Sequence, residues 1–221
     1  AIANQINGDI HAHYKGVYSA VGTAGTTPFG TTMDAINARE ALNANRAPLD
    51  PRYGVIDTKA EAKALALSEF AHAEKSGSDD VVIRGELGEK FGINWVLDHA
   101  VAYHTAGTAG GASGDDMVVA SAVAAGATTV PVQANVAGSA GTLVEGDILT
   151  FAGSDQTYTV VEGVSVSDGA AINVKVAPAV VDPLAGGEVA TKAASHRANL
   201  VFHRDAFAFV NRPLTERTGG L

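Results

Sequence analysis

Apolar residues recur every three or four positions at the start of the chain, a spacing that places them on one face of a helix. The pattern predicts a helix over residues 1–22, whose inward side chains are Ile2, Ile6, Ile10, Tyr14, Val17, Tyr18 and Val21. Gly8 and Gly16 interrupt this helix, and each costs roughly 1 kcal/mol relative to alanine. Packing against another part of the protein must therefore hold the helix together.

A second helix is expected after the turn-rich loop TAGTTPFGTT. It has the sequence MDAINAREALNAN, with Thr32 as its N-cap and with Ile36 and Leu42 pointing inward. Pro48 limits its continuation, because proline has no backbone N–H and clashes with the preceding turn.

Strands and a third helix follow. The segment RYGVID indicates a short strand. A helix is expected over TKAEAKALALSEFAHAEKSG, which begins with the capping-box pair Thr58 and Glu61 and ends, after the basic Lys75, near Gly77. VVIRGEL and GINWVLDHAVAY have the pattern of strands. The first half of the chain is therefore α/β in character.

The pattern changes near HTAGTAGGASG, and short β-rich runs then continue from about residue 115 to 194. These runs are MVVASAV, TTVPVQ, GDILTFAG, QTYTVVEGVSV and AAINVKVAPAV, separated by glycines and polar turns. Such spacing is typical of a small antiparallel barrel or sandwich. Phe151 and Tyr158 are the aromatic residues of the region, so valine, isoleucine and leucine should fill its core. We interpret it as a domain inserted into the α/β part, which makes the chain α+β overall.

Composition and charge exclude several classes of protein. The 221 residues are 46% hydrophobic and 18% charged, as in an ordinary globular protein. The net charge of −9 argues against a protein that reads nucleic-acid sequence, which normally carries a basic stripe. Without cysteine there is no disulfide and no thiolate site. No apolar run approaches the roughly 18 residues of a membrane span, and no signal peptide is expected.

The stretch SHRANLVFHRDAFAFVNRPL contains the densest polar cluster. Its HRDAFAFVN segment resembles the catalytic loop of protein kinases, but the expected asparagine position is Val210 and the other kinase motifs are missing. As a strand over residues 202–210 it has apolar residues on both faces, as in an interior strand. His203, Arg204 and Asp205 then lie at its middle or at a bend, where we expect them to pair with neighbours.

No other motif predicts a catalytic, cofactor-binding or metal site. His11 and His13 diverge by roughly 200° on a helix and cannot share a metal ion. His99 and His104 lie near Asp98, but further ligands are not in sight. The glycine-rich loop has no P-loop lysine, and no Gly-x-Ser-x-Gly elbow marks a nucleophile. The expectation is a protein that is not an enzyme.

Three segments together resemble the major capsid (coat) proteins of tailed bacteriophages, in the branch with an inserted β-barrel domain. They are GELGEKFGINWVLDHAVAYHTAGT, GDILTFAG with QTYTVVEGVSVSDGAAINVKVAPAV, and NLVFHRDAFAFVNRPL. Their order also matches that family: a long helix, a loop and axial helix, the insertion, and a returning strand with the sequence FHRDAF. The resemblance covers nearly the whole chain.

The resemblance implies a peripheral domain on a spine helix and an axial domain with a central sheet. Residues 1–110 would form the peripheral and axial core, 111–194 the inserted barrel, and 195–221 the return strand of the core. The family has an N-terminal arm, an extended loop and a C-terminal end that have no counterpart here. The chain starts at Ala1 inside a periodic pattern and stops at TGGL, so we expect a fragment or a chain that lacks both ends.

The function implied is that of a self-assembling subunit of an icosahedral head shell, located in the virion. Its partners would be further copies in pentamers and hexamers, with scaffolding, portal or cement proteins, around DNA bound without sequence specificity and with no membrane. An acidic wall that does not grip DNA would let it be packed and released. Two alternatives remain at this point. One is a barrel that recognises a glycan or host surface, and the other is an enzyme of unrecognised type.

Overall fold

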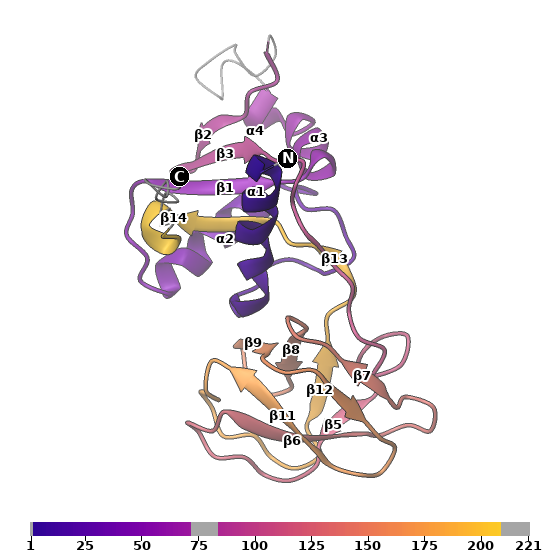
Figure 1. Cartoon of the computed structure of the whole chain (residues 1–221). Helices are drawn as coiled ribbons and strands as arrows, with labels where there is room; N and C mark the ends of the chain where they lie inside the picture. Colours follow the sequence, from indigo (N-terminus) through magenta and orange to yellow (C-terminus); the bar gives the residue numbers. More distant parts are fainter. Residues whose placement is uncertain (1, 72–83, 209–221) are drawn as a thin grey trace, which may run out of the picture.

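The structure is a computed structural model that describes residues 2–71 and 84–208 (Figure 1). Within these residues the chain is a mixed α+β protein with a closed, six-stranded antiparallel β-barrel. Two separate hydrophobic cores form, one in the barrel and one in the α/β part above it in Figure 1. Across these residues no helix is long and apolar enough to cross a membrane.

The α/β part is built on a four-stranded sheet, in the order β14-β1-β3-β2 among the described residues. Its strands are β1 (Arg52–Ile56), β2 (Gly88–Lys90), β3 (Ile93–Leu97) and β14 (Leu200–His203). β1 pairs parallel to β3 and antiparallel to β14. Strands that precede and follow the barrel in the sequence therefore flank the same central strand.

Helices cover one face of this sheet. They are α2 (Met33–Ala44), α3 (Thr58–Leu65) and α4 (Ser68–Ala71). Phe29 lies at the centre of the packing, edge-on to Phe70 and Trp95 with ring centroids 5.8 and 5.1 Å away. Three buried alanines let the helices approach closely: Ala35, Ala38 and Ala60. The buried set is completed by Ile56, Ala64, Leu87 and Ile93.

The barrel confirms the predicted antiparallel β region. Its strands follow the order β11-β6-β5-β12-β8-β9, with bounds β5 Met117–Val119, β6 Thr129–Ala134, β8 Ile148–Phe151, β9 Thr157–Val160, β11 Ile172–Ala177 and β12 Val189–Lys192. A separate pair joins β7 (Gly141–Leu143) to β10 (Val164–Val166). Valines and leucines dominate the core around Phe151 and Tyr158. The expected isoleucines do not join it, because Ile148 and Ile172 face outward at intermediate or greater exposure.

The two connections to the barrel run side by side and pair with each other. β4 (Tyr103–His104) enters the barrel and β13 (His196–Arg197) leaves it, and they form an antiparallel ladder with His196 opposite His104. Figure 1 shows these chains together between the two parts. The predicted domain division at 110 and 194 stays a prediction, while the barrel strands themselves lie between Met117 and Lys192.

The first predicted helix is too long. α1 spans Ile2–Ala12, the 3₁₀ helix η1 spans His13–Gly16, and the backbone is extended from Val17 onward. Val17 and Val21, expected to face inward, are 40% and 49% exposed. After η1 the chain does not continue the helical ladder, because Tyr18 and Ala20 bond to Thr157 of the barrel.

Two predicted helix starts are also corrected. Thr32 has helical dihedrals and makes no side-chain cap, and its hydroxyl donates instead to Glu69. Ile36, expected to be buried, is 38% exposed, because the small Ala35 and Ala38 form the packed face. At α3 the cap is Asp57, one residue before the predicted Thr58, and its carboxylate accepts from the Ala60 N–H.

Other predicted bounds shift as well. The third helix is divided into α3 and α4, and its expected end near Gly77 lies outside the described residues. Of the predicted strand 81–87, the described residues 84–87 are not a strand, and β2 begins only at Gly88. The last predicted strand ends at His203, where the 3₁₀ helix η2 (Arg204–Ala206) bends the chain. Phe209 and Val210 lie outside the described residues.

Gly54 offers a test of the α/β core. A Cβ at this position of β1 would lie 2.4 Å from Cε3 of Trp95 on the neighbouring strand. We expect Gly54→Ala to lower the free energy of unfolding by about 1–3 kcal/mol, the usual cost of overpacking. Urea unfolding followed by fluorescence of Trp95, the one tryptophan of the sequence, measures it. Gly8→Ala in α1, where a Cβ meets no atom within 4 Å, is the control and should not destabilise the protein.

Candidate functional site

The polar cluster of the FHRDAF stretch is a local surface feature. His203 precedes η2, and its ring Nε2 donates to the Asp50 carbonyl at 3.3 Å while its Nδ1 accepts from the Asp205 N–H. Arg204 contacts Asp205 at 3.5 Å, and both side chains are about 70% exposed. The three residues therefore pair with close neighbours at a bend.

The histidines near Asp98 divide between two sites. Asp98 is bonded to His11 of α1, whose Nε2 lies 3.1 Å from its Oδ2, and not to His99 or His104. His13 lies apart from His11, with its ring centroid 6.5 Å from that of Phe207. Across residues 2–71 and 84–208 no three side chains of metal-ligating type are grouped to hold an ion.

Asp98 anchors α1 to the loop after β3. Burial disfavours its charged form, but hydrogen bonds from the Ala100 N–H, the Asn7 amide and His11 outweigh burial, so the pKa of Asp98 lies below its ordinary value. The ionised carboxylate of Asp98 therefore stabilises the fold, because Ala100, Asn7 and His11 all donate hydrogen bonds to it.

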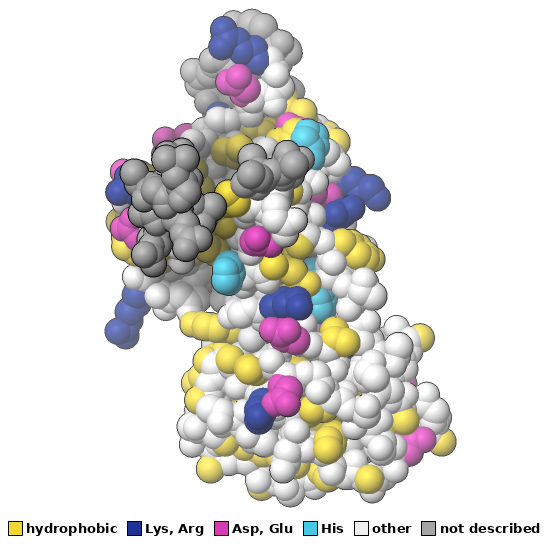
Figure 2. All heavy atoms as spheres, viewed as in Figure 1, with side chains coloured by type: hydrophobic (Ala, Val, Ile, Leu, Met, Phe, Trp, Pro, Cys, Tyr) yellow, Lys and Arg dark blue, Asp and Glu magenta, His cyan; other side chains and the backbone are white. Residues whose placement is uncertain are grey.

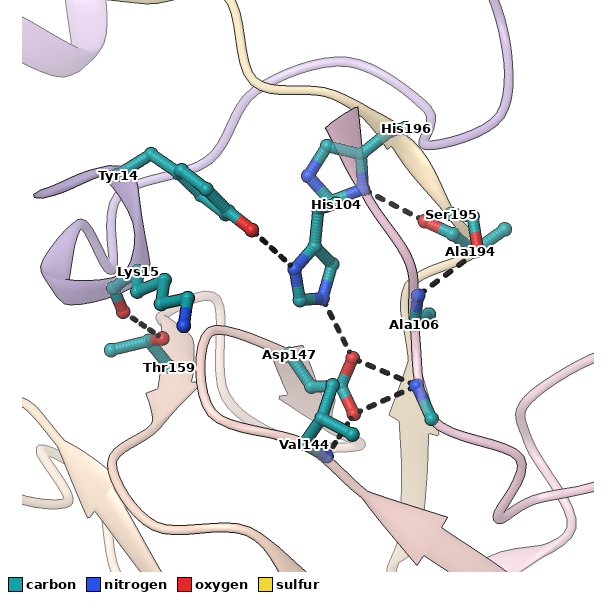
Figure 3. A network of polar contacts seen from close by, with 11 residues as sticks. Tyr14, Lys15, His104, Ala106, Val144, Asp147, Thr159, Ala194, Ser195 and His196 are labelled. Carbon is teal, nitrogen blue, oxygen red and sulfur yellow. Dashed lines mark hydrogen bonds and ion pairs between the residues drawn. The ribbon is translucent and has the colours of Figure 1, made fainter. Parts of the chain in front are cut away.

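The most deeply buried polar group of the described residues lies where the barrel meets the α/β part (Figure 3). It is the carboxylate of Asp147, fully buried in the turn before β8. His104 Nε2 lies 2.8 Å from its Oδ1, and the Val144 N–H donates to Oδ2 at 2.8 Å. The Gly107 N–H donates to both oxygens at 3.2 Å. The barrel and its entering linker thus share one buried charged group.

Tyr14 of η1 extends this network to the N-terminal helix. Its hydroxyl lies 3.0 Å from His104 Nδ1 (Figure 3). Burial raises the pKa of the Tyr14 phenol, with Lys15 opposing and Asp147 and Glu145 adding to the rise. The phenol therefore keeps its proton. Because an ionised carboxylate only accepts, His104 Nε2 carries the proton toward Asp147, and its Nδ1 accepts from Tyr14.

Close approach of the backbones makes this network possible. A Cβ at Gly107 would lie 2.0 Å from the Thr142 carbonyl oxygen, and one at Gly141 would lie 2.6 Å from Thr108 Oγ1. Only glycine fits such spacing. The small residues of HTAGTAGG, which mark the change of pattern in the sequence, thus let the linker lie against the barrel.

The segment of residues 14–20, which we call the strap, adds a third attachment. Thr159 Oγ1 of β9 donates to the Lys15 carbonyl at 2.8 Å, and Thr157 Oγ1 donates to the Tyr18 carbonyl while accepting from the Ala20 N–H. Lys15 Nζ also lies 3.4 Å from Glu145. The strap, the entering linker and the leaving linker therefore all hold the barrel.

A hollow of about 320 Å³ adjoins the network, lined by Tyr14, Lys15, Tyr103, His104, Thr105, Val144 and Glu145. Two of the lining side chains belong to the buried network, since Tyr14 bonds to His104 and His104 bonds to Asp147. The network of Tyr14, His104 and Asp147 can hold the barrel and the α/β part in one orientation.

Sequence reasoning missed two members of this network. Asp147 lies in GDILTFAG, which was assigned only to a strand, and Tyr14 was assigned only to an apolar helix face. The available signal was an aspartate in a Glu-Gly-Asp turn just before a strand, a place where carboxylates often bond to backbone N–H groups.

Comparisons with known proteins leave the family open. No protein-family model matches the sequence, and no curated protein matches it. Among solved structures, one described as Mycobacterium phage Che8 is weakly similar, at 12% identity and a TM-score of 0.41. The similarity covers 91% of this chain, which spans 58% of that structure.

Removing the buried charge tests the junction. In Asp147→Asn, the amide would turn donors toward the N–H groups of Gly107 and Val144, so we expect a loss of about 2–4 kcal/mol in the free energy of unfolding. Denaturant unfolding followed by circular dichroism measures this loss. Glu162→Gln removes an exposed partner of Lys175 and should change nothing measurable. Wild-type stability of the Asp147 variant would contradict a structural role for the carboxylate.

The lowered pKa of Asp98 predicts a pH dependence. The pKa of this carboxyl is lower in the folded protein than in the unfolded chain, where it is about 3.9. Its ionised form therefore stabilises the protein at pH values above about 3.9, and this contribution is lost as the pH falls through the pKa of the folded protein. Asp98→Asn should therefore be less stable than wild type at pH 7, and the difference should shrink toward pH 3. Unfolding of both proteins at several pH values measures it. A pH-independent difference would count against the ionised carboxylate.

Proposed function

We propose that the chain is a structural subunit of a tailed-phage head shell, a major capsid protein with an inserted β-barrel. The proposal rests first on the ordered resemblance of three sequence segments to that family. One structural observation carries it further: a closed barrel is inserted between strands that flank the same central strand of an α/β sheet. This is the arrangement that the family resemblance implies.

The alternative of a glycan-binding barrel finds less support. Barrels that bind sugars usually present exposed aromatic rings, on which ligands stack. Both aromatic residues of the region 111–194 are buried, Phe151 at 2% and Tyr158 at 0% exposure. Neither ring is available to a ligand at the surface. Figure 2 shows small, scattered hydrophobic areas on the visible face of the barrel.

We also propose that the chain is not an enzyme, because several polar side chains that could do chemistry are bonded to neighbours within the protein. Three of the histidines that the sequence analysis considered bond to a neighbour: His11 to Asp98, His104 to Asp147, and His203 to Asp50. Side chains engaged in this way hold structure. Association of many identical copies needs only modest free energy for each contact, because contacts multiply in a closed assembly.

Charge supports the proposed relation to DNA. Residues 111–194 contain nine Asp or Glu residues and two lysines. Lys192 is 7% exposed and Lys175 is paired with Glu162. Such a surface repels a polyanion. We propose that the barrel faces away from packaged DNA and that the shell encloses DNA without reading its sequence.

Assembly tests the proposal. Electron microscopy of native particles that contain the complete gene product should show closed icosahedral shells in which this chain is the repeated unit, in pentamers and hexamers. Scaffolding, portal or cement proteins would co-purify with them. A complete gene product that stays a soluble monomer in sedimentation experiments, or a shell whose inner face is strongly basic, would overturn the proposal.

A further inference from the structure

Over residues 5–12, where the side chains of α1 are described, the helix has no hydrophobic anchor in either core. Within that range Ile6 and Ile10 are only partly buried, and His11, at 5% exposure, is the buried side chain. An isolated helix of 11 residues is marginal in water, and Gly8 weakens it further. Over residues 5–12, contacts other than core packing must therefore order α1.

Polar contacts supply the two anchors that the structure shows. At its middle, α1 bonds to Asp98 through Asn7 at 2.8 Å and His11 at 3.1 Å. At its C-terminal end it continues through η1 into the strap, residues 14–20. There the chain bonds to β9 of the barrel, through Thr157 and Thr159, and to His104 through Tyr14.

The hydrogen bonds between the strap and β9 are well placed to fix the position of the strap. Thr159 is 1% exposed and donates to the Lys15 carbonyl one turn after α1 ends. Thr157 both donates to Tyr18 and accepts from Ala20. The strap is joined to the α/β part by two exposed hydrogen bonds with Asn45, from the Tyr18 hydroxyl at 3.3 Å and to the Ser19 hydroxyl at 3.2 Å. The barrel therefore holds the strap more firmly than the α/β part does.

We propose that the barrel orders α1 through the strap, so that the helix and the barrel's docking form one cooperative unit, although α1 also bonds to Asp98 after β3. A change in the attachment of the barrel would then alter the stability of α1, although the strap residues and their partners on β9 are more than 130 positions apart in the sequence. This coupling rests on the described contacts alone and holds whether or not the chain is a shell subunit.

Hydrogen exchange on the full chain tests the coupling. The double variant Thr157→Val and Thr159→Val keeps the shape of the β9 side chains and removes the two β9 hydroxyls that bond to the strap. Loss of these three hydrogen bonds, to the Lys15 and Tyr18 carbonyls and from the Ala20 N–H, should raise amide exchange across α1 about tenfold or more. Amides of β1, β3, β6 and β11 should keep their wild-type rates. Thr129→Val on β6, on the side of the barrel away from the junction (Figure 1), is the matched control and should leave α1 unchanged.

A second variant leaves the barrel sequence untouched. Tyr14→Phe removes the hydroxyl between the strap and His104 (Figure 3) and should also raise exchange in α1, by several-fold, with the barrel protected as before. Wild-type exchange of α1 in both variants would overturn the proposal. An equal rise in amide exchange in α1 and in the sheet strands β1 and β3 would also overturn it, since the helix would then open together with the sheet.

Discussion

A buried carboxylate decides how the two parts of this chain fit together. Asp147 is fully buried and bonds to donors from the linker after β4, from its own turn and from His104, which in turn bonds to Tyr14. A charge in this position is costly unless donors surround it. An orientation that moves the linker away removes the His104 and Gly107 donors from the carboxylate, and one that moves η1 away removes the Tyr14 partner of His104. The donors must therefore arrive together, and this condition selects one orientation of the barrel.

The order of the strands imposes a second constraint on the same region. β1 lies between β3 and β14, which are separated in the sequence by the whole barrel. The sheet is complete only when the chain has left the barrel and returned. A barrel that closes on itself, with its own core, can occupy this interval without disturbing the sheet. The β4–β13 ladder then brings the two linkers together, so the returning chain starts beside the place from which it left.

Local patterns predicted the elements whose signals are local, even where their strands pair with distant ones, as Val118 does with Val189. The barrel followed from short runs of β-branched residues separated by glycine, since strand alternation and turn chemistry are both local signals. The prediction of α1 went too far because Val17, Tyr18 and Val21 continue a helical spacing while their backbone bonds to Thr157. Nothing within the first 22 residues carries that information. The junction was missed for the same reason: His104 lies beside Asp98 in the sequence, but its partners are 43 and 90 positions away.

The polar junction also has a consequence that an apolar one would lack. Apolar surfaces tolerate small sliding and rotation, because their attraction has little direction, whereas hydrogen bonds weaken steeply with angle. A contact made by Tyr14, His104 and Asp147 therefore specifies an angle between the parts as well as their proximity. If the chain forms a closed shell, as we propose, each copy must present its surfaces at the same angle, because an error in one subunit is repeated around every symmetry axis. A directional, buried contact meets that requirement at the point where the inserted barrel would otherwise pivot on its linkers.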